Sequence, residues 1–112
     1  MPELPAGDNI LEEIIAQANG APIVLDFQYD ACAPCQEIAP EFEALKDDYP
    51  EVFFYKVDIF EHRDLLTELE VQAIPTFKVW YAGELESTFE GGDVLEELTT
   101  EVDTLNGFWL EN

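Results

Sequence analysis

The feature that most constrains this chain is a short apolar run, Ile23 to Leu25 followed by Phe27, in which Asp26 is the one charged residue. Apolar side chains on both faces are typical of a central strand that helices cover on either side. A chain of 112 residues can bury such a core as one domain without disulfide or metal staples. We therefore predict a single α/β domain over residues 1–112, with this strand inside the sheet.

Apolar spacing and turn residues predict the other elements. Helices are expected over residues 9–20, from the cysteine pair to Pro50, around residues 65–69, and from Asp93 to Asn106-Gly107. In the first helix, Asn9 and Glu12 are expected to form a capping box and Gly20 to end the helix. Pro40 is expected to kink the second helix. Strands are expected over residues 22–29, 52–57, 76–81 and 85–89, the last two joined at Ala82-Gly83. This order predicts a mixed sheet of four to five strands with helices on both faces. The tail after Gly107 is expected either to pack back on the sheet or to form a contact surface.

The charge balance excludes several kinds of partner. The chain has 26 Asp and Glu against four Lys and Arg, for a formal net charge of -22. Nucleic acid and anionic membranes, which bind clustered basic residues, are not expected as partners. No apolar run approaches the roughly 18 residues of a spanning helix, and the first residues lack a secretion signal. We expect a cytoplasmic protein whose acidity reflects either a high-salt cytoplasm or a basic partner.

The segment Cys32-Ala33-Pro34-Cys35 lies where the buried strand ends and a helix begins. Free N–H groups and the positive end of the helix dipole stabilise a thiolate at a helix N-terminus. Cys32 is therefore predicted to be the attacking thiol, and Cys35, one turn later, the resolving thiol. Pro34 suits the first helical turn because its missing N–H would have no partner there.

The sequence leaves two other interpretations of the cysteine pair open. The thiols could simply fill a core, as small apolar side chains do. Zinc or an iron-sulfur cluster would need further ligands, and His62 is the one histidine available beside the two thiolates. No metal and no bound cofactor are expected, and His62 is interpreted as a surface helix-cap residue.

Several segments together resemble the thioredoxin family over about residues 9–105. The matching segments are Val24-Leu25-Asp26-Phe27, Cys32-Ala33-Pro34-Cys35, Ile38-Ala39-Pro40, Lys56-Val57-Asp58, Ile74-Pro75-Thr76 and Gly91-Gly92. The resemblance implies a thioredoxin fold and protein-disulfide reduction through the dithiol.

The resemblance also implies roles for residues outside the cysteine pair. Asp26 would be a buried carboxylate that exchanges a proton with Cys35, and Lys56 would share its charge, although a strand-end carboxylate and a solvent-facing lysine are the plain alternatives. Pro75 would be a cis-proline facing the disulfide, with an ordinary turn as the alternative. The implied substrate-binding residues are Ala31, Ala33, Pro34, Ile74, Pro75, Gly91 and Gly92.

The chain also departs from the family pattern near the first cysteine. The family usually carries Trp where this chain has Gln28 and Ala31, so apolar docking surface is absent there. Ala33-Pro34 between the cysteines points to the reducing members. The acidic residues Asp30, Glu37 and Glu41 are expected to oppose thiolate formation.

The leading hypothesis is a monomeric dithiol reductant of disulfide-containing proteins, restored by an electron donor like thioredoxin reductase. One rival is a binding or assembly module on the same fold, with the absent Trp residues as a sign of relaxed catalytic demand. Another is a thiol oxidant or isomerase, which would have a reduction potential well above the cytosolic poise.

The charge of -22 generates a first prediction. Carboxylate repulsion should weaken as salt shortens the Debye length to about 3 Å near 1 M. We expect the melting temperature to rise from low to multimolar potassium chloride, measured by circular dichroism. A flat or falling melting temperature would contradict this expectation.

Overall fold

The computed structural model describes residues 3–111. The elements along the chain are α1 (Ile10–Ala18), β1 (Ile23–Gln28), α2 (Ala33–Asp48), β2 (Phe53–Asp58), α3 (Arg63–Glu68), β3 (Thr76–Tyr81), β4 (Glu84–Glu90) and α4 (Leu95–Glu111). Residues 1, 2 and 112 lie outside the described residues, so the assignment of one domain to residues 1–112 stays a prediction.

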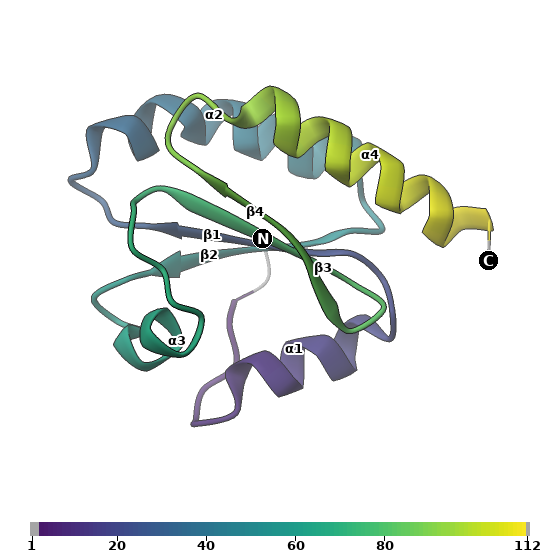
Figure 1. The fold of residues 1–112 in the computed structure, drawn as a ribbon, viewed down its shortest axis with the longest axis horizontal. Coiled ribbons are helices and arrows are strands. Elements are labelled where there is room, and N and C mark those ends of the chain that lie inside the picture. The colour runs from purple at the N-terminus through teal and green to yellow at the C-terminus, as the bar shows by residue number, and fades with distance from the viewer. Residues whose placement is uncertain (1–2, 112) are drawn as a thin grey trace.

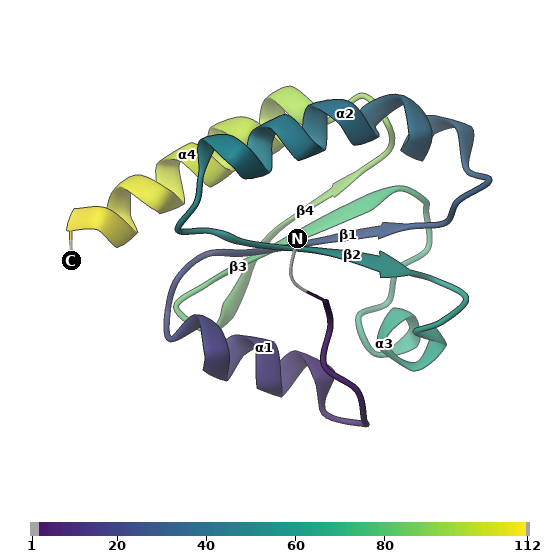
Figure 2. The ribbon, with the colours of Figure 1, turned by 180° about the vertical axis from the view of Figure 1, so that it is seen from behind.

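The four strands form one mixed sheet in the order β2-β1-β3-β4. Strand β1 pairs in parallel with β2 and antiparallel with β3, and β3 pairs antiparallel with β4. Helices α2 and α4 cover one face of the sheet, while α1 and α3 cover the other (Figures 1 and 2). The predicted mixed sheet with helices on both faces is therefore confirmed. Within residues 3–111, the helices do not combine the length and apolar character needed to cross a bilayer.

Strand β1 contributes to two hydrophobic cores because its side chains alternate between the faces. Val24 packs in the core under α2 and α4, whereas Ile23 and Leu25 pack in the core on the α1 and α3 side. In the first core, the ring of Phe42 meets Phe54 edge-on at 5.5 Å between ring centroids. Asp26 alternates with Leu25, so it lies on the same face as Val24 and beneath α2.

Helix α4 runs past the predicted end at Asn106-Gly107 and continues to Glu111, so that expectation was wrong. Gly and Asn are weak helix formers, but tertiary contacts override such preferences. Asn106 is buried, and the ring of Trp109 packs back against Gly20 beyond the sheet. Trp109 of the tail therefore packs back against the fold, as one of the two expectations had it, while Phe108 is exposed and a contact surface there stays a prediction.

The limits of α1 also differ from the expectation. Asn9 is the N-cap, but its side chain makes no capping hydrogen bond, so the capping box with Glu12 is not formed. The helix ends at Ala18, and its C-cap is Asn19 in the left-handed conformation, one residue before Gly20. Asn tolerates that conformation better than most side chains do.

The core supplies a second prediction. Phe42→Ala removes a fully buried ring that contacts both Phe54 and Phe77, and should lower the free energy of unfolding by about 3 to 5 kcal/mol. The matched control is Phe108→Ala, because that ring is 53% exposed and should change stability by about 0.5 kcal/mol or less. Urea unfolding at fixed salt measures both variants. Equal losses would show that the Phe42 cluster is not the stabilising core.

Candidate active site

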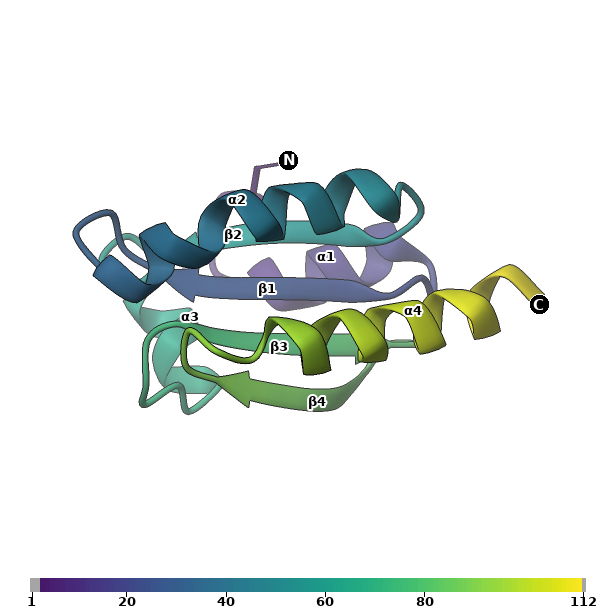
Figure 3. The same cartoon turned by 90° about the horizontal axis from the view of Figure 1, so that it is seen from above.

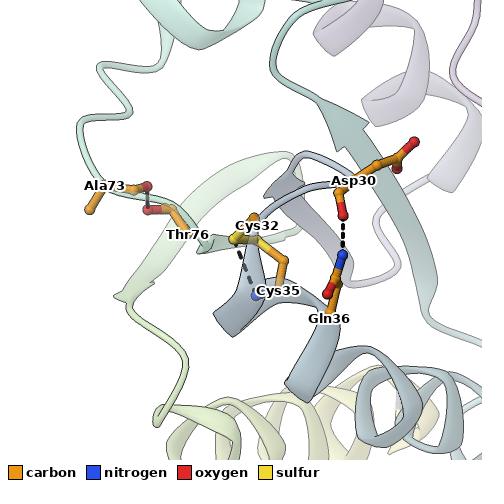
Figure 4. Close-up of a disulfide and its surroundings, with 6 residues drawn as sticks. All are labelled: Asp30, Cys32, Cys35, Gln36, Ala73 and Thr76. Atoms are coloured by element: carbon orange, nitrogen blue, oxygen red, sulfur yellow. Dashed lines mark hydrogen bonds between the residues drawn. A yellow bond between two sulfur atoms is a disulfide. The ribbon is translucent and has the colours of Figure 1, made fainter.

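The two cysteines form a disulfide at the turn from β1 into α2, with their Cα atoms 5.2 Å apart (Figure 4). Cys32 is the N-cap of α2, and its sulfur accepts a hydrogen bond from the backbone N–H of Cys35 at 3.2 Å. The backbone N–H of Cys32 donates to the carbonyl of Tyr29, which closes the turn. The sulfur of Cys32 thus occupies the position where helix N–H groups and the helix dipole stabilise a thiolate.

The surface beside this disulfide is formed by small side chains. Cys32 is 3% exposed and Cys35 is 7% exposed, so both sulfurs lie just beneath the surface. Ala31, Ala33 and Pro34 are all exposed beside them. A substrate can therefore approach over a surface of two methyl groups and a proline ring. Cys32 precedes the helix and Cys35 lies within it, and the assignment of Cys32 as the attacking thiol and Cys35 as the resolving thiol stays a prediction.

A second segment, before β3, reaches the same end of the sheet. The peptide bond between Ile74 and Pro75 is cis, as predicted. The hydroxyl of Thr76 donates to the carbonyl of Ala73 across this turn at 2.5 Å, and the view of the site places both residues near the cysteines (Figure 4). The carbonyl of Pro75 accepts a hydrogen bond from Gly91 at 2.9 Å, which joins the turn to the end of β4.

The glycine pair after β4 lies against the turn that holds the cysteines. A Cβ atom at Gly92 would lie 3.1 Å from the Cβ of Pro34, tighter than ordinary packing. Gly91 has a φ of +105°, which other residues adopt only with strain. The two glycines therefore let this loop lie close to the disulfide.

Asp26 is the buried carboxylate of this site. It is 4% exposed, and its Oδ1 has no hydrogen-bond partner within residues 3–111. Burial raises the pKa of Asp26 from 3.8 to about 7, while Lys56 lowers it in part and Glu43 raises it further. The strand-end alternative is therefore wrong, because the side chain is enclosed beneath α2 rather than solvated at an edge.

Lys56 is the sheet neighbour of Asp26 in the register of β1 and β2. Its ammonium group, however, forms an ion pair with Glu43 of α2 at 3.3 Å, and the second oxygen of Glu43 lies 3.4 Å from Lys46. Lys56 thus acts on Asp26 at longer range, while part of its charge is balanced by Glu43. Sequence reasoning missed Glu43, since a carboxylate two helical turns after Cys35 looks like any solvated residue of this acidic chain.

No group of three or more His, Cys, Asp and Glu within residues 3–111 is arranged to hold a metal ion. His62 occupies the N-cap position of α3, but its side chain makes no capping hydrogen bond. His62 therefore occupies the expected helix-cap position, but its side chain does not cap the helix with a hydrogen bond.

Comparison with known proteins agrees with this geometry. Residues 5–104 match the protein-family profile described as Thioredoxin. The chain is 33% identical to thioredoxin of Rattus norvegicus over 103 residues, which cover 90% of this chain and 98% of that one, and 35% identical to thioredoxin of Geodia cydonium over 81 residues, which cover 72% and 76%. The X-ray structure of Fasciola hepatica thioredoxin superposes with a TM-score of 0.85 at 34% identity, covering 94% of this chain and 99% of that one.

The pKa of Asp26 supplies a third prediction. Because this pKa is about 7 in the folded protein and 3.8 ordinarily, the folded chain holds a proton between those values that the unfolded chain releases. Stability therefore falls as pH rises from about 4 to about 7, and the lost stability is not recovered at higher pH. Asp26→Asn removes this effect, so the variant should gain roughly 4 kcal/mol relative to wild type between pH 4 and pH 8. Urea unfolding of the oxidised proteins across that range measures the difference, and a difference independent of pH would contradict the raised pKa.

Proposed function

Since this chain belongs to the thioredoxin family and is a protein-disulfide reductase, we propose that it is a monomeric cytoplasmic reductant that a thioredoxin reductase restores. The observation that carries this proposal is the disulfide at the N-terminus of α2, with the Cys32 sulfur at the capping position. A dithiol at that place is poised for exchange rather than for structural stapling.

The exchange proceeds in two steps that balance in electrons. In the reduced protein, the Cys32 thiolate attacks one sulfur of a substrate disulfide, forms a mixed disulfide and expels the other sulfur as a thiolate, which takes up a proton. Cys35 then loses its proton, attacks the Cys32 sulfur and expels the second substrate thiolate. The substrate gains two electrons, and the protein is left with the Cys32–Cys35 disulfide seen here.

We assign the proton of Cys35 to Asp26. A carboxylate with a pKa of about 7 is divided between its protonated and ionised forms near neutral pH, so it can both accept and return a proton. Asp26 lies beneath α2, the helix that carries Cys35. Lys56 and its partner Glu43 would set how readily Asp26 ionises, because their charges act on it in opposite directions.

The substrate segment is proposed to lie across the three loops that meet at the disulfide. The backbone of Ile74, beside Pro75, would pair with an extended segment of the substrate. Gly91 and Gly92 would leave room for that segment. Its contacts on the cysteine side would be Ala31, Ala33 and Pro34, which are exposed.

The chemistry of a reductant supports the proposed cytoplasmic location and the proposed electron donor. A dithiol that donates electrons must be returned to its reduced form, and the cytosol keeps thiols reduced. Ala33-Pro34 between the cysteines also favours the reducing direction. The net charge of -22 argues against nucleic-acid and membrane partners. Recovery of the protein in a cell fraction that is oxidising would contradict this location.

Insulin reduction tests the catalytic assignment as a fourth prediction. With dithiothreitol as donor, wild type should shorten the time to insulin turbidity, whereas Cys32→Ser should match the rate without protein, because the attacking thiolate is gone. Reduced Cys35→Ser, freed of dithiothreitol before it is mixed with insulin, should instead accumulate a mixed disulfide, visible on a non-reducing gel, because no thiol is left to resolve it. Equal turbidity rates for wild type and Cys32→Ser would remove the catalytic claim and favour a binding module.

A further inference from the structure

Phe60 is an exposed aromatic residue in the loop between β2 and α3. Its side chain is 60% exposed. The ring of Tyr29 contacts it edge-on at 5.5 Å between ring centroids, and the guanidinium of Arg63 lies 5.7 Å from its centroid. These two contacts restrict the position of the ring and leave much of its surface open to solvent.

The backbone of this loop is fixed as well. Oδ1 of Asp58 accepts hydrogen bonds from the N–H groups of Phe60 at 2.8 Å and of Glu61 at 3.3 Å. The N–H of Ile59 donates to the carbonyl of Gln28 at the end of β1. A rigid exposed aromatic ring loses little conformational entropy when it binds a partner, which favours a role in docking.

The ring lies beside the reactive turn. Tyr29, which contacts Phe60, accepts the hydrogen bond from the backbone N–H of Cys32. The other exposed large apolar residues within residues 3–111 are Leu85 at the β3–β4 turn and Phe108 and Leu110 near the end of α4. Those elements lie at the end of the molecule away from the start of α2 (Figure 3). Phe60 is thus the large apolar side chain exposed at the active-site end.

The exposed charged residues on the segments that flank the disulfide are acidic. They are Asp30 on the turn before Cys32, Glu37 within α2, Glu90 at the end of β4 and Asp93 in the loop before α4. Of the four basic residues of the chain, Lys46 and Lys56 pair with Glu43, the buried Lys78 donates to Thr88, and Arg63 lies over Phe60. A substrate that approaches the disulfide therefore meets an acidic surface in which Phe60 adds a large apolar contact to the small ones of Ala31, Ala33 and Pro34.

From this arrangement we propose that Phe60 is a specificity residue that binds an apolar side chain next to the substrate half-cystine, and that the acidic surface selects segments rich in Lys or Arg. The substrate class is a protein disulfide in a basic segment with a neighbouring apolar residue. This inference rests on the proposed reductase function. This chain has Gln28 and Ala31 where the family usually carries Trp, so apolar docking surface is absent near its first cysteine. Phe60 would supply such surface from the β2–α3 loop instead.

The test uses the reduced full-length protein and short peptides whose single cysteine carries thionitrobenzoate as a mixed disulfide. Attack by Cys32 on the peptide sulfur releases coloured thionitrobenzoate, and Cys35 then releases the peptide thiol. Four peptides combine Leu or Ser beside the cysteine with Lys or Glu further out. Phe60→Ala should lower kcat/KM for the Leu peptides about fivefold, as loss of an interface anchor does, and should leave the Ser peptides unchanged.

Leu110→Ala is the matched control, because its side chain is also 60% exposed but lies near the end of α4. It should react like wild type with all four peptides, and Phe60→Ala should keep the wild-type melting temperature. The Lys peptides should react faster than the Glu peptides at low salt, and 1 M potassium chloride should reduce that difference.

The outcomes separate this inference from the function on which it rests. If wild type releases no thionitrobenzoate from any peptide, the reductase function fails. If wild type reacts but Phe60→Ala reacts equally with the Leu peptides, or slows equally with Leu and Ser peptides, the docking role of Phe60 is overturned. Equal rates for Lys and Glu peptides at low salt would overturn the charge selection alone.

Discussion

The burial of β1 on both faces fixes the position of the active site. Because Val24 packs under α2 and α4 while Ile23 and Leu25 pack toward α1 and α3, the strand has little freedom to shift. Its end therefore delivers Cys32 to one place, the capping position of α2. The cis turn at Pro75 and the loop at Gly92 reach the same place because β3 pairs with β1, and β4 pairs with β3.

The same burial makes Asp26 both costly and useful. An ionised carboxylate inside a strand with apolar neighbours must do without water, so its proton is held until near neutral pH. Asp26 with its raised pKa therefore destabilises the fold near neutral pH, which is also the pH at which it can transfer a proton. Lys56 on the adjoining strand moderates this conflict because it lowers the pKa of Asp26, and its ion pair with Glu43 limits that effect. Stability and reactivity are thus coupled through one side chain.

The acidic surface and the aromatic loop divide the task of recognition. Long-range attraction from a net charge of -22 is unselective in detail, since it steers any basic segment toward the protein. A fixed ring such as Phe60 distinguishes partners at short range through contact with one side chain. The placement of Arg63 over that ring keeps a basic residue close to the aromatic contact without leaving a broad basic patch.

The sequence by itself determined the element order, the mixed sheet and the cysteine pair, because these follow from local apolar periodicity and from turn residues. It also singled out Asp26, as a carboxylate in an apolar strand, and the resemblance to the thioredoxin family singled out Pro75, which lies just before β3. The tertiary structure alone decided that α4 continues through Asn106 to Glu111, that Lys56 pairs with Glu43, and that Phe60 stands beside Tyr29. Those features depend on contacts between segments far apart in the chain, and local pattern carries no information about such contacts.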